Sequence, residues 1–390
     1  MSSENQRNVV ALNAPQGIDV GRLEKELAAS WRNAGEAEAS GVTRVCVLNL
    51  IIYAAPGEDR AKIDELLDVV TQYAPSRALV LIADREAAET RLEAYVSTRC
   101  QAATKGAAKQ VCGEQVTIEA GGAAVATVAS AIEPLVVPDV PVFLWWKDIP
   151  HEEDKLFNRL VELSDRVVID SLVFDHPHED MRRLAQLIGE RRQFMLTSDL
   201  NWGRLTSWRN LVASFWDVAD YRPHLDAIDH VLVEYDRPEA AATEIAAQAL
   251  LAVGWLASAL KWEPTGEFAR EGDSSRWVVR AGGRRLNVEF RATGNPRGGE
   301  GHIAALTLKT NSTGAEFYVG VNEAWTKLET SAKIGDARAV GRVVTYEAKS
   351  EGERLSRELS ILSRDEIYER AVASVGQLLE VLRKSLANLN

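Results

Sequence analysis

The sequence predicts an α/β domain with a mixed sheet and covering helices, followed by an α+β domain in which helices back an antiparallel meander. Apolar runs at residues 45–55 and 78–83 flank a segment of helical periodicity, as in sheets buried on both faces. Three later segments, 286–290, 306–308 and 317–321, instead alternate apolar and polar side chains, as in strands with one buried face. The 390 residues are enough for two domains that each bury a core.

The first domain follows a polar, aperiodic stretch, residues 1–18, that we interpret as a flexible arm. The runs at 45–55 and 78–83 are predicted strands, and an amphipathic helix is predicted between them. Two alternating segments, 92–100 and 111–119, predict a hairpin that makes the sheet mixed. The apolar positions of the helix are Ile63, Leu66, Leu67 and Val70.

The rest of the first domain alternates helices with buried strands. An Ala- and Gly-rich stretch at 121–133 predicts a tightly packed helix, and apolar runs at 142–146 and 167–169 predict strands. A short helix is predicted between these strands, at 156–163. Because alternating helices and buried strands are typical of covered sheets, we expect residues 19–174 to form one α/β domain.

The pattern changes at residue 175. Asp175, Pro177 and Glu179 form a helix-start signature, which marks the beginning of a new run of helices. We therefore place the domain boundary after residue 174 and assign residues 175–390 to the second domain.

The second domain is predicted to back its meander with helices. Helical segments at 178–190, 206–217 and 239–260 lie on either side of a strand at 231–235. Gly282-Gly283 predicts a two-residue hairpin turn between two of the strands that follow. The apolar face of a final helix consists of Ile367, Ala371, Val375, Leu378 and Leu382.

The composition excludes several partners and locations. Lys and Arg number 45 against 57 Asp and Glu, a net charge of −12, whereas proteins that coat nucleic acid carry clustered positive charge. No run of about 18 apolar residues and no apolar signal segment occurs, so we expect no membrane span. Three cysteines without zinc-binding spacing favour a cytoplasmic protein.

The sequence lacks the common catalytic and cofactor-binding signatures. Neither a G-x-x-x-x-G-K-[ST] loop nor the dinucleotide spacing G-x-G-x-x-G occurs, and the glycine cluster at 294–301 fits neither. The hydrolase G-x-S-x-G and the zinc motif H-E-x-x-H are also absent. We therefore predict no catalytic residue, no metal and no cofactor.

One cluster, Asp175, His176, His178 and Asp180, keeps an enzyme as the alternative. Carboxylates and imidazoles at this density could hold a divalent metal or transfer a proton. The same residues also suit a helix N-terminus, where Asp175 would cap the helix and acidic side chains would face its positive end. Because no further ligand set stands out in the chain, we favour the helix cap.

Two cysteines, Cys100 and Cys112, flank the predicted hairpin symmetrically about Gly106. In a register centred there, they face each other at a Cα separation that a disulfide can bridge. We favour buried free thiols, because free cysteine is among the most buried residue types. A redox pair is the alternative hypothesis.

Tryptophan is frequent, with 10 residues. Two of them end the stretch 142–146, and two lie together with two arginines in the stretch 199–209. Part of the second stretch follows a helical apolar stripe that is typical of a core, and part does not. Trp and Arg dominate the hot spots of protein interfaces, and Arg is also the preferred partner of phosphates. The predicted partner-binding residues are Trp202, Arg204, Trp208, Arg209, Trp145 and Trp146.

At these residues the chain resembles the glucose-6-phosphate dehydrogenase assembly protein family, OpcA. The resemblance rests on blocks in matching order and spacing across about residues 40–240, the last reading Asp-Leu-Asn-Trp-x-Arg-Leu-Thr-x-Trp-Arg. It implies a non-catalytic bacterial protein that binds and activates glucose-6-phosphate dehydrogenase, the entry enzyme of the oxidative pentose phosphate pathway. The blocks are residues 75–77, 111–116, 141–146, 165–171 and 199–209.

Three functions follow as hypotheses. The resemblance implies a protein-binding allosteric activator of the dehydrogenase, which would shift its partner between conformations and is the function we predict. A metal-dependent or sugar-phosphate-processing enzyme would use the cluster of Asp175, His176, His178 and Asp180. A small-molecule binding module would stack tryptophans on a sugar or nucleotide and hold its phosphate with Arg204.

Overall fold

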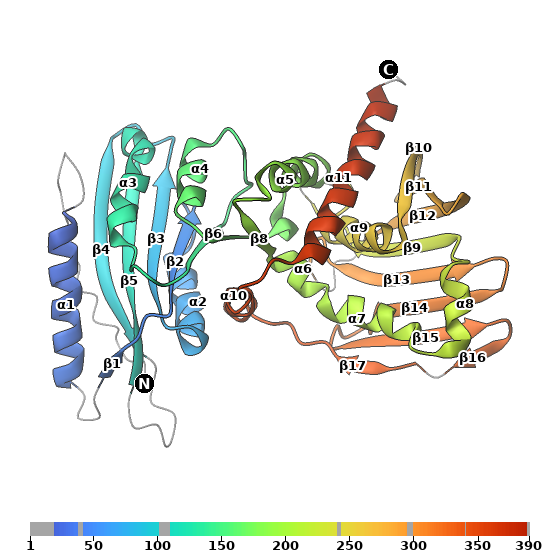
Figure 1. The fold of residues 1–390 in the computed structure, drawn as a ribbon, viewed down its shortest axis with the longest axis horizontal. Helices are drawn as coiled ribbons and strands as arrows, with labels where there is room; N and C mark the ends of the chain where they lie inside the picture. Colours follow the sequence, from blue (N-terminus) through green and yellow to red (C-terminus); the bar gives the residue numbers. More distant parts are fainter. Residues whose placement is uncertain are drawn as a thin grey trace. The chain divides into compact units, whose positions relative to one another are not determined.

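The computed structural model describes residues 19–37, 42–100, 110–239, 243–294, 299–339 and 341–387. The predicted arm and the tip of the predicted hairpin, residues 101–109, lie outside the described residues. The chain divides into two compact units (Figure 1), which we call unit 1 and unit 2. Unit 1 comprises Met1–Ile169, Gln193–Ser198 and Ser350–Arg364, and unit 2 comprises Asp170–Arg192, Asp199–Lys349 and Asp365–Asn390.

The predicted fold class is confirmed, because each unit holds a mixed sheet with helices. The chain changes unit at residue 169 and later returns twice to unit 1. Whether residues 19–174 and 175–390 fold as separate domains stays a prediction.

Unit 1 is built on a sheet of eight described strands in the order β1-β5-β3-β2-β6-β7-β8, with β4 also paired to β5. The pairs β2 with β3, β2 with β6 and β6 with β7 are parallel, whereas the β4–β5 hairpin is antiparallel. Every residue of β2 is buried, which explains its unbroken apolar run. The strands are β1 Val42–Arg44, β2 Leu48–Ala54, β3 Ser76–Asp84, β4 Arg91–Cys100, β5 Gln110–Gly121, β6 Val142–Trp146, β7 Arg166–Ile169 and β8 Leu196–Asp199.

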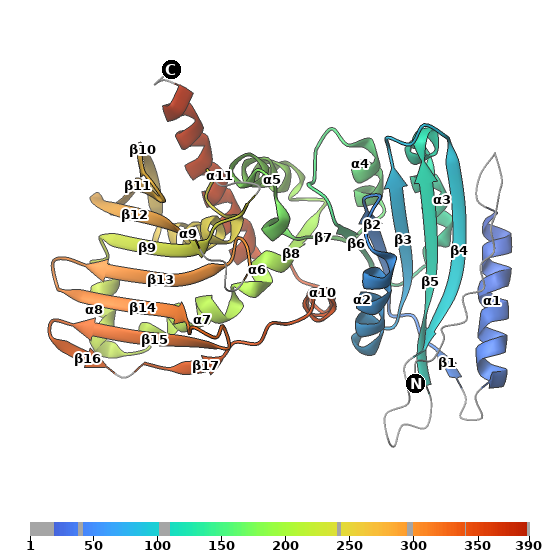
Figure 2. The ribbon, with the colours of Figure 1, turned by 180° about the vertical axis from the view of Figure 1, so that it is seen from behind.

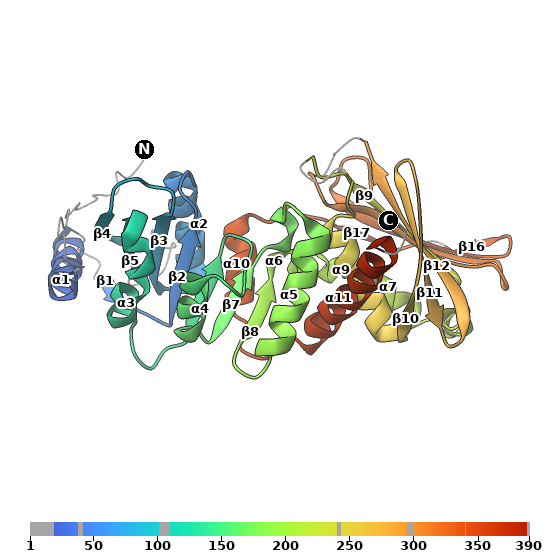
Figure 3. The ribbon, with the colours of Figure 1, turned by 90° about the horizontal axis from the view of Figure 1, so that it is seen from above.

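The helices of unit 1 connect these strands. The apolar stripe predicted between the first two strands is confirmed, since it is the buried face of α2. A helix from late in the chain, α10, packs against α2, and Figures 1, 2 and 3 show the two side by side. The helices are α1 Val20–Ala37, α2 Arg60–Tyr73, α3 Val128–Ile132, α4 Lys155–Glu162 and α10 Glu351–Leu359.

The single helix predicted at 121–133 is wrong. The stretch forms a 3-10 turn, Gly122–Ala126, then α3, then a second 3-10 turn, Glu133–Leu135. Gly122 has a φ of +55°, and a Cβ there would approach the carbonyl oxygens of Ala87 and Glu89 to 3.0 and 3.1 Å. A backbone in this conformation and this close to a loop cannot continue a helix.

Unit 2 is built on nine described strands in the order β10-β11-β12-β9-β13-β14-β15-β16, with β17 paired to β15. The Gly282-Gly283 turn is confirmed, because Ala281 faces Arg284 across the β11–β12 hairpin. The strands are β9 His230–Asp236, β10 Trp262–Glu271, β11 Ser274–Ala281, β12 Arg284–Thr293, β13 Ile303–Thr310, β14 Ala315–Val321, β15 Lys327–Ile334, β16 Ala337–Ala339 and β17 Val343–Thr345.

The prediction of a purely antiparallel meander is wrong in one respect. Strand β9 lies between β12 and β13, parallel to the first and antiparallel to the second. An early strand therefore divides the meander and makes the sheet mixed.

The helices of unit 2 lie against one face of this sheet and against one another. On β14, the Phe317 ring is surrounded by Phe215 of α7, Trp216 and Tyr221. The long helix α11 packs against α5, α9 and β10 (Figure 3). No described helix is long and apolar enough to span a bilayer. The helices are α5 Pro177–Arg191, α6 Leu200–Arg204, α7 Thr206–Phe215, α8 Arg222–Leu225, α9 Ala247–Leu260 and α11 Glu366–Ala387.

Candidate functional site

The tryptophan- and arginine-rich motif begins where β8 ends. Asp199 closes the strand and caps α6, because its carboxylate accepts the Asn201 backbone N–H at 2.9 Å. An acceptor at this position satisfies one of the free donors of a helix N-terminus. The motif then continues through α6 and into α7, so its side chains surround one tight turn of unit 2.

The Asp199 carboxylate is only 1% exposed and is a shared acceptor. Ser171 donates to it from its backbone N–H at 3.0 Å and from its hydroxyl at 2.7 Å, and the Tyr368 hydroxyl lies 3.4 Å away. Burial and the neighbouring carboxylate of Asp170 raise the pKa of Asp199 to about 7, although the hydrogen bonds from Ser171 oppose this rise. The group therefore takes up its proton near neutral pH.

A chain of hydrogen bonds extends from this carboxylate across unit 2. The Asn201 amide donates to the Ser171 hydroxyl at 3.1 Å and accepts from Gln248 of α9 at 2.8 Å. Gln248 in turn accepts the backbone N–H of Ile303 on β13 at 2.8 Å. The network links α6, α9 and the sheet, and we call it the Asp199 network. Sequence reasoning missed it, although a glutamine within the apolar run of α9 was a signal.

Two arginines of the motif are held by neighbouring side chains. Arg204 makes a bidentate ion pair with Asp170, at 2.7 and 2.8 Å, and both side chains are largely buried. The guanidinium of Arg209 lies over the Trp202 ring, 3.6 Å from its centroid, and donates to the Thr206 hydroxyl at 3.3 Å. The Arg204–Asp170 pair is thus internal and structural, whereas the Arg209 side chain is half-buried.

The four tryptophans predicted to bind a partner lie in the interior. The Trp202 indole donates to Asp365 at 2.9 Å, and Trp208 meets Tyr346 edge to face. Trp145 and Trp146 belong to β6 of unit 1 and are each 1% exposed. The structure thus brings Trp202, Arg204, Trp208 and Arg209 into one region of unit 2 and places the other two in unit 1. The role of all six as partner contacts stays a prediction.

The acidic and histidine cluster lies at the start of α5. The predicted cap at Asp175 is wrong, because the N-cap is His176, whose side chain makes no capping hydrogen bond. The His178 Nε2 atom accepts the backbone N–H of Ile245 at 2.9 Å, so its lone pair is already used. Burial, with a smaller effect of Arg270, lowers the pKa of His178 to about 4. Asp180 accepts the backbone N–H of His176 at 3.0 Å. Among the described residues, no group of three or more His, Cys, Asp or Glu side chains could hold a metal ion.

The predicted cysteine register is confirmed, since Cys100 faces Cys112 across the β4–β5 hairpin. Cys112 is buried and disulfide-bonded, so the expectation of a free thiol there is wrong. The side chain of Cys100 lies outside the described residues. Cys46 is free and half-buried, and its burial raises the pKa of the thiol.

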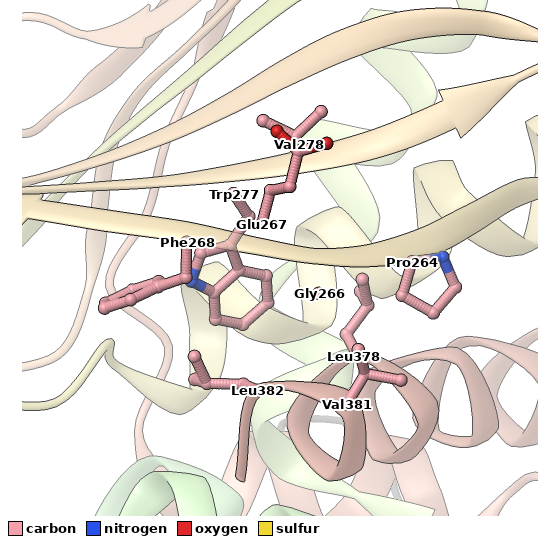
Figure 4. Close-up of a pocket in the computed structure, with 9 residues that line it drawn as sticks. All are labelled: Pro264, Gly266, Glu267, Phe268, Trp277, Val278, Leu378, Val381 and Leu382. Carbon is pink, nitrogen blue, oxygen red and sulfur yellow. The ribbon is translucent and has the colours of Figure 1, made fainter. Parts of the chain in front are cut away.

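One small apolar hollow opens in unit 2 between β10, β11 and α11 (Figure 4). A bulge between Pro264 and Phe268 separates β10 from β11 there. The hollow measures about 20 Å³, which is room for one water molecule and too little for a sugar phosphate or nucleotide. Its lining includes Gly266, Trp277, Leu378, Val381 and Leu382.

Comparison with known proteins bears on both halves of the chain. The family profile described as "Glucose-6-phosphate dehydrogenase subunit N-terminal domain" matches residues 68–186, and the profile of the corresponding C-terminal domain matches residues 195–372. Proteins named "Putative OxPP cycle protein OpcA" are similar to the chain. The one from Synechocystis sp. is 26% identical over 324 residues, and the one from Nostoc punctiforme is 27% identical over 298 residues.

These matches cover 81% and 74% of this chain but only 66% and 62% of the two relatives. Among solved structures, levoglucosan dehydrogenase in complex with NADH and L-sorbose aligns with 87% of this chain and 97% of its own. That alignment has 12% identity and a TM-score of 0.46, values that support no conclusion about activity.

Proposed function

Since this chain belongs to the glucose-6-phosphate dehydrogenase assembly protein family, OpcA, we propose that it binds glucose-6-phosphate dehydrogenase and supports the oxidative pentose phosphate pathway. The observation that carries the proposal is that the two family profiles match consecutive parts of the chain, in both units. The relatives' names point to the same pathway.

The protein acts on the dehydrogenase as a non-catalytic allosteric activator. It favours the conformation of the enzyme with higher substrate affinity, and its effect is limited by its own difference in affinity for the two conformations.

Among the predicted residues, we assign the contact with the dehydrogenase to Arg209. It is half-buried, and the Trp202 ring beneath its guanidinium orients it. Arg is enriched at interface hot spots because it combines a flat, weakly hydrated cation with five donors. Trp202 then acts as a positioning residue.

The test measures the same organism's glucose-6-phosphate dehydrogenase at sub-saturating substrate, with and without this protein, beside size-exclusion co-elution. We expect stimulation and co-elution, and weaker association of Arg209→Ala with an unchanged melting temperature. Arg159→Ala, which removes an exposed ion pair with Glu162, is the matched control. Absence of both stimulation and co-elution would overturn the proposal, and unchanged binding of Arg209→Ala would remove that residue from the interface.

The assay is run in reducing and in oxidising buffer, because Cys100 and Cys112 form a proposed redox pair in the β4–β5 hairpin. A non-reducing mass measurement that finds no crosslink between these two residues would end that part of the proposal. The cytoplasmic location stays a prediction from the sequence.

A metal-dependent enzyme built on Asp175, His176, His178 and Asp180 has no observation in its favour. The less exposed imidazole of the cluster, that of His178, is already hydrogen-bonded through Nε2. Metal analysis of the purified protein, compared with His178→Ala, decides this alternative.

A further inference from the structure

The strand order of unit 1 is typical of sheets that bind a dinucleotide, but the residues of unit 1 do not fit a dinucleotide. β1 and β4 each pair with β5 and are left out of the numbering. The other six strands, β2, β3, β5, β6, β7 and β8, numbered one to six in chain order, lie in the order third, second, first, fourth, fifth, sixth. This is the doubly wound order of dinucleotide-binding sheets. In such sheets the dinucleotide lies where the order reverses, here at the carboxyl ends of β2 and β6.

The place of the pyrophosphate is the N-terminus of the helix that follows the first strand, here α2. In this protein the carboxylate of Asp59 takes that place, because it accepts the Ala61 backbone N–H at 2.9 Å. Glu58 precedes it, and Gly57 is the single glycine between β2 and α2. A pyrophosphate at this helix end would meet two negative charges and would have to displace the cap.

Aromatic rings cover the sheet where β2 and β6 end. Tyr53 of β2 and Trp146 of β6 are stacked, with ring centroids 3.7 Å apart and an interplanar angle of 10°. Both side chains are almost fully buried, at 2% and 1% exposure. A nicotinamide or ribose at the reversal point would have to displace this stack.

Two cations at this edge are also engaged. Arg85, which follows β3, pairs with Asp154. The Lys147 ammonium follows β6 and lies 3.1 Å from the Glu58 carboxylate and 3.7 Å from that of Glu351. Glu351 is the first residue of α10, a segment that belongs to unit 1 although the chain on either side of it belongs to unit 2. Lys147, which could otherwise bind a phosphate, is therefore paired with carboxylates of the same unit.

Close packing fixes α10 in this position. A Cβ on Gly352 would lie 2.9 Å from Val69 and 3.0 Å from the Leu66 carbonyl oxygen, so the backbone of α10 lies directly on α2. At the far end of the segment, Arg166 of β7 donates to the Ser363 carbonyl at 2.6 Å. The segment is thus attached both at α2 and at the sheet.

We infer that unit 1 is a doubly wound sheet whose dinucleotide site is occupied by side chains of unit 1 itself. The carboxylate of Asp59 occupies the N-terminus of α2, where the pyrophosphate would lie. Glu58 and Glu351 pair with Lys147. The Tyr53–Trp146 stack lies at the point where the strand order reverses. The sheet therefore binds neither NADP nor NAD, and α10 is its resident internal partner. This inference does not depend on the proposed function.

The first test titrates the full-length protein with NADPH and with NADH and follows nucleotide fluorescence and the melting temperature. We expect no saturable change up to millimolar nucleotide, whereas a dinucleotide-dependent dehydrogenase in the same assay saturates. Saturable binding of either nucleotide would overturn the inference.

The second test asks whether Lys147 and Glu351 hold α10 in place. Hydrogen exchange is measured on Lys147→Met, on Glu351→Gln and on the double variant. For a pair of this partial exposure we expect exchange of the α10 amides to rise roughly two- to five-fold in each single variant and no further in the double variant.

Glu162→Gln, in the exposed pair with Arg159, is the control that leaves α10 unchanged. Unchanged exchange of α10 in Lys147→Met and Glu351→Gln would refute its role as internal partner. Because neither test contains the dehydrogenase, failure here leaves the proposal of dehydrogenase binding standing, and failure of that proposal leaves this inference standing.

Discussion

Asp199 joins three separate segments of unit 2 through one carboxylate. Ser171, Asn201 and Tyr368 all donate to it, and they come from before the motif, from the motif and from α11. A buried acceptor with this many donors makes the turn between β8 and α6 rigid. The same burial that makes it rigid also makes it sensitive to pH.

We predict that Asp199 gives stability a specific pH dependence. Its pKa rises from 3.8 to about 7 on folding, so the folded protein binds the proton more tightly than the unfolded chain. The contribution is fully present below about pH 4 and is lost as the pH rises through about 7. The urea midpoint of Asp199→Asn, measured against wild type, should therefore shift in the variant's favour from pH 5 to pH 8.

The control for this measurement is Asp217→Asn, which makes the same substitution at an exposed position. A difference between Asp199→Asn and wild type that stays constant across this range would show that Asp199 is ionised in the folded protein throughout.

The Arg204–Asp170 pair leads to a second prediction. Arg204→Ala leaves a largely buried carboxylate without its partner, next to Asp199, and should lower the free energy of unfolding by about 3 kcal/mol. Arg159→Ala breaks a pair whose side chains are 58% and 61% exposed, and should cost less than about 1 kcal/mol. Urea denaturation measures both. If Arg204→Ala kept full stability but lost dehydrogenase binding, Arg204 would be a contact residue instead.

Close packing between helices limits which side chains the helices tolerate where they touch. Gly254 of α9 faces α11, where a Cβ would lie 2.5 Å from both the Ala371 carbonyl oxygen and a methyl group of Val375. Gly254→Ala should therefore lower the free energy of unfolding by at least about 2 kcal/mol, because one helix must move.

Gly189→Ala on α5 is the matched control, since nothing lies within 4 Å of its added methyl group. The better helix propensity of alanine should stabilise that variant by up to about 1 kcal/mol. Equal effects of the two substitutions in thermal and urea unfolding would contradict the packing of α9 on α11.

Elements whose pattern is local could be predicted from the sequence. The buried face of α2 could be predicted because a 3.6-residue period is visible in the segment itself, without knowledge of what packs on it. Its residues are Ile63, Leu66, Leu67 and Val70. The stretch at 121–133 could not be predicted, since its alanines favour a helix while contacts of Gly122 with a distant loop impose 3-10 turns. The place of β9 inside the sheet was hidden for the same reason, because only tertiary pairing sets it.

The candidate site was predicted in part. Sequence reasoning singled out residues 199–209 and predicted Trp202 and Arg204 as partner contacts, although it left core and surface open for the tryptophans. Their partners Asp365 and Asp170 lie far along the chain, so their burial could not be read from the motif. Ser171 and Tyr368 were missed because nothing in their own segments marks them. Gln248 stands out as a polar residue in the apolar run of α9, but its partners are set only by the folded network.

The division of the chain into two units determines which fragments contain a complete unit. Unit 1 includes Gln193–Ser198, which supplies β8, and Ser350–Arg364, which supplies α10. A fragment of residues 19–174 lacks both, so it exposes the edge of β7 and the face of α2 on which α10 lies.

We predict that this fragment does not fold into a stable domain. It should show a broad, weakly cooperative melt and concentration-dependent aggregation, whereas the full chain melts cooperatively. Near-ultraviolet circular dichroism and light scattering measure this, with addition of a synthetic peptide of residues 350–364 as a partial rescue. A sharp melt of the fragment alone would show that residues 19–174 are an independent domain after all.

The late position of α10 in the chain sets an order of events during synthesis. The ribosome finishes the first five strands of unit 1 long before it reaches residue 350, and at about 5 to 20 residues per second the delay is on the order of tens of seconds. Throughout that interval the nascent chain keeps the α2 surface that α10 will cover open to solvent and to chaperones. The N-terminal unit is therefore completed after most of the C-terminal unit has been made, which is the reverse of the order in which translation presents them.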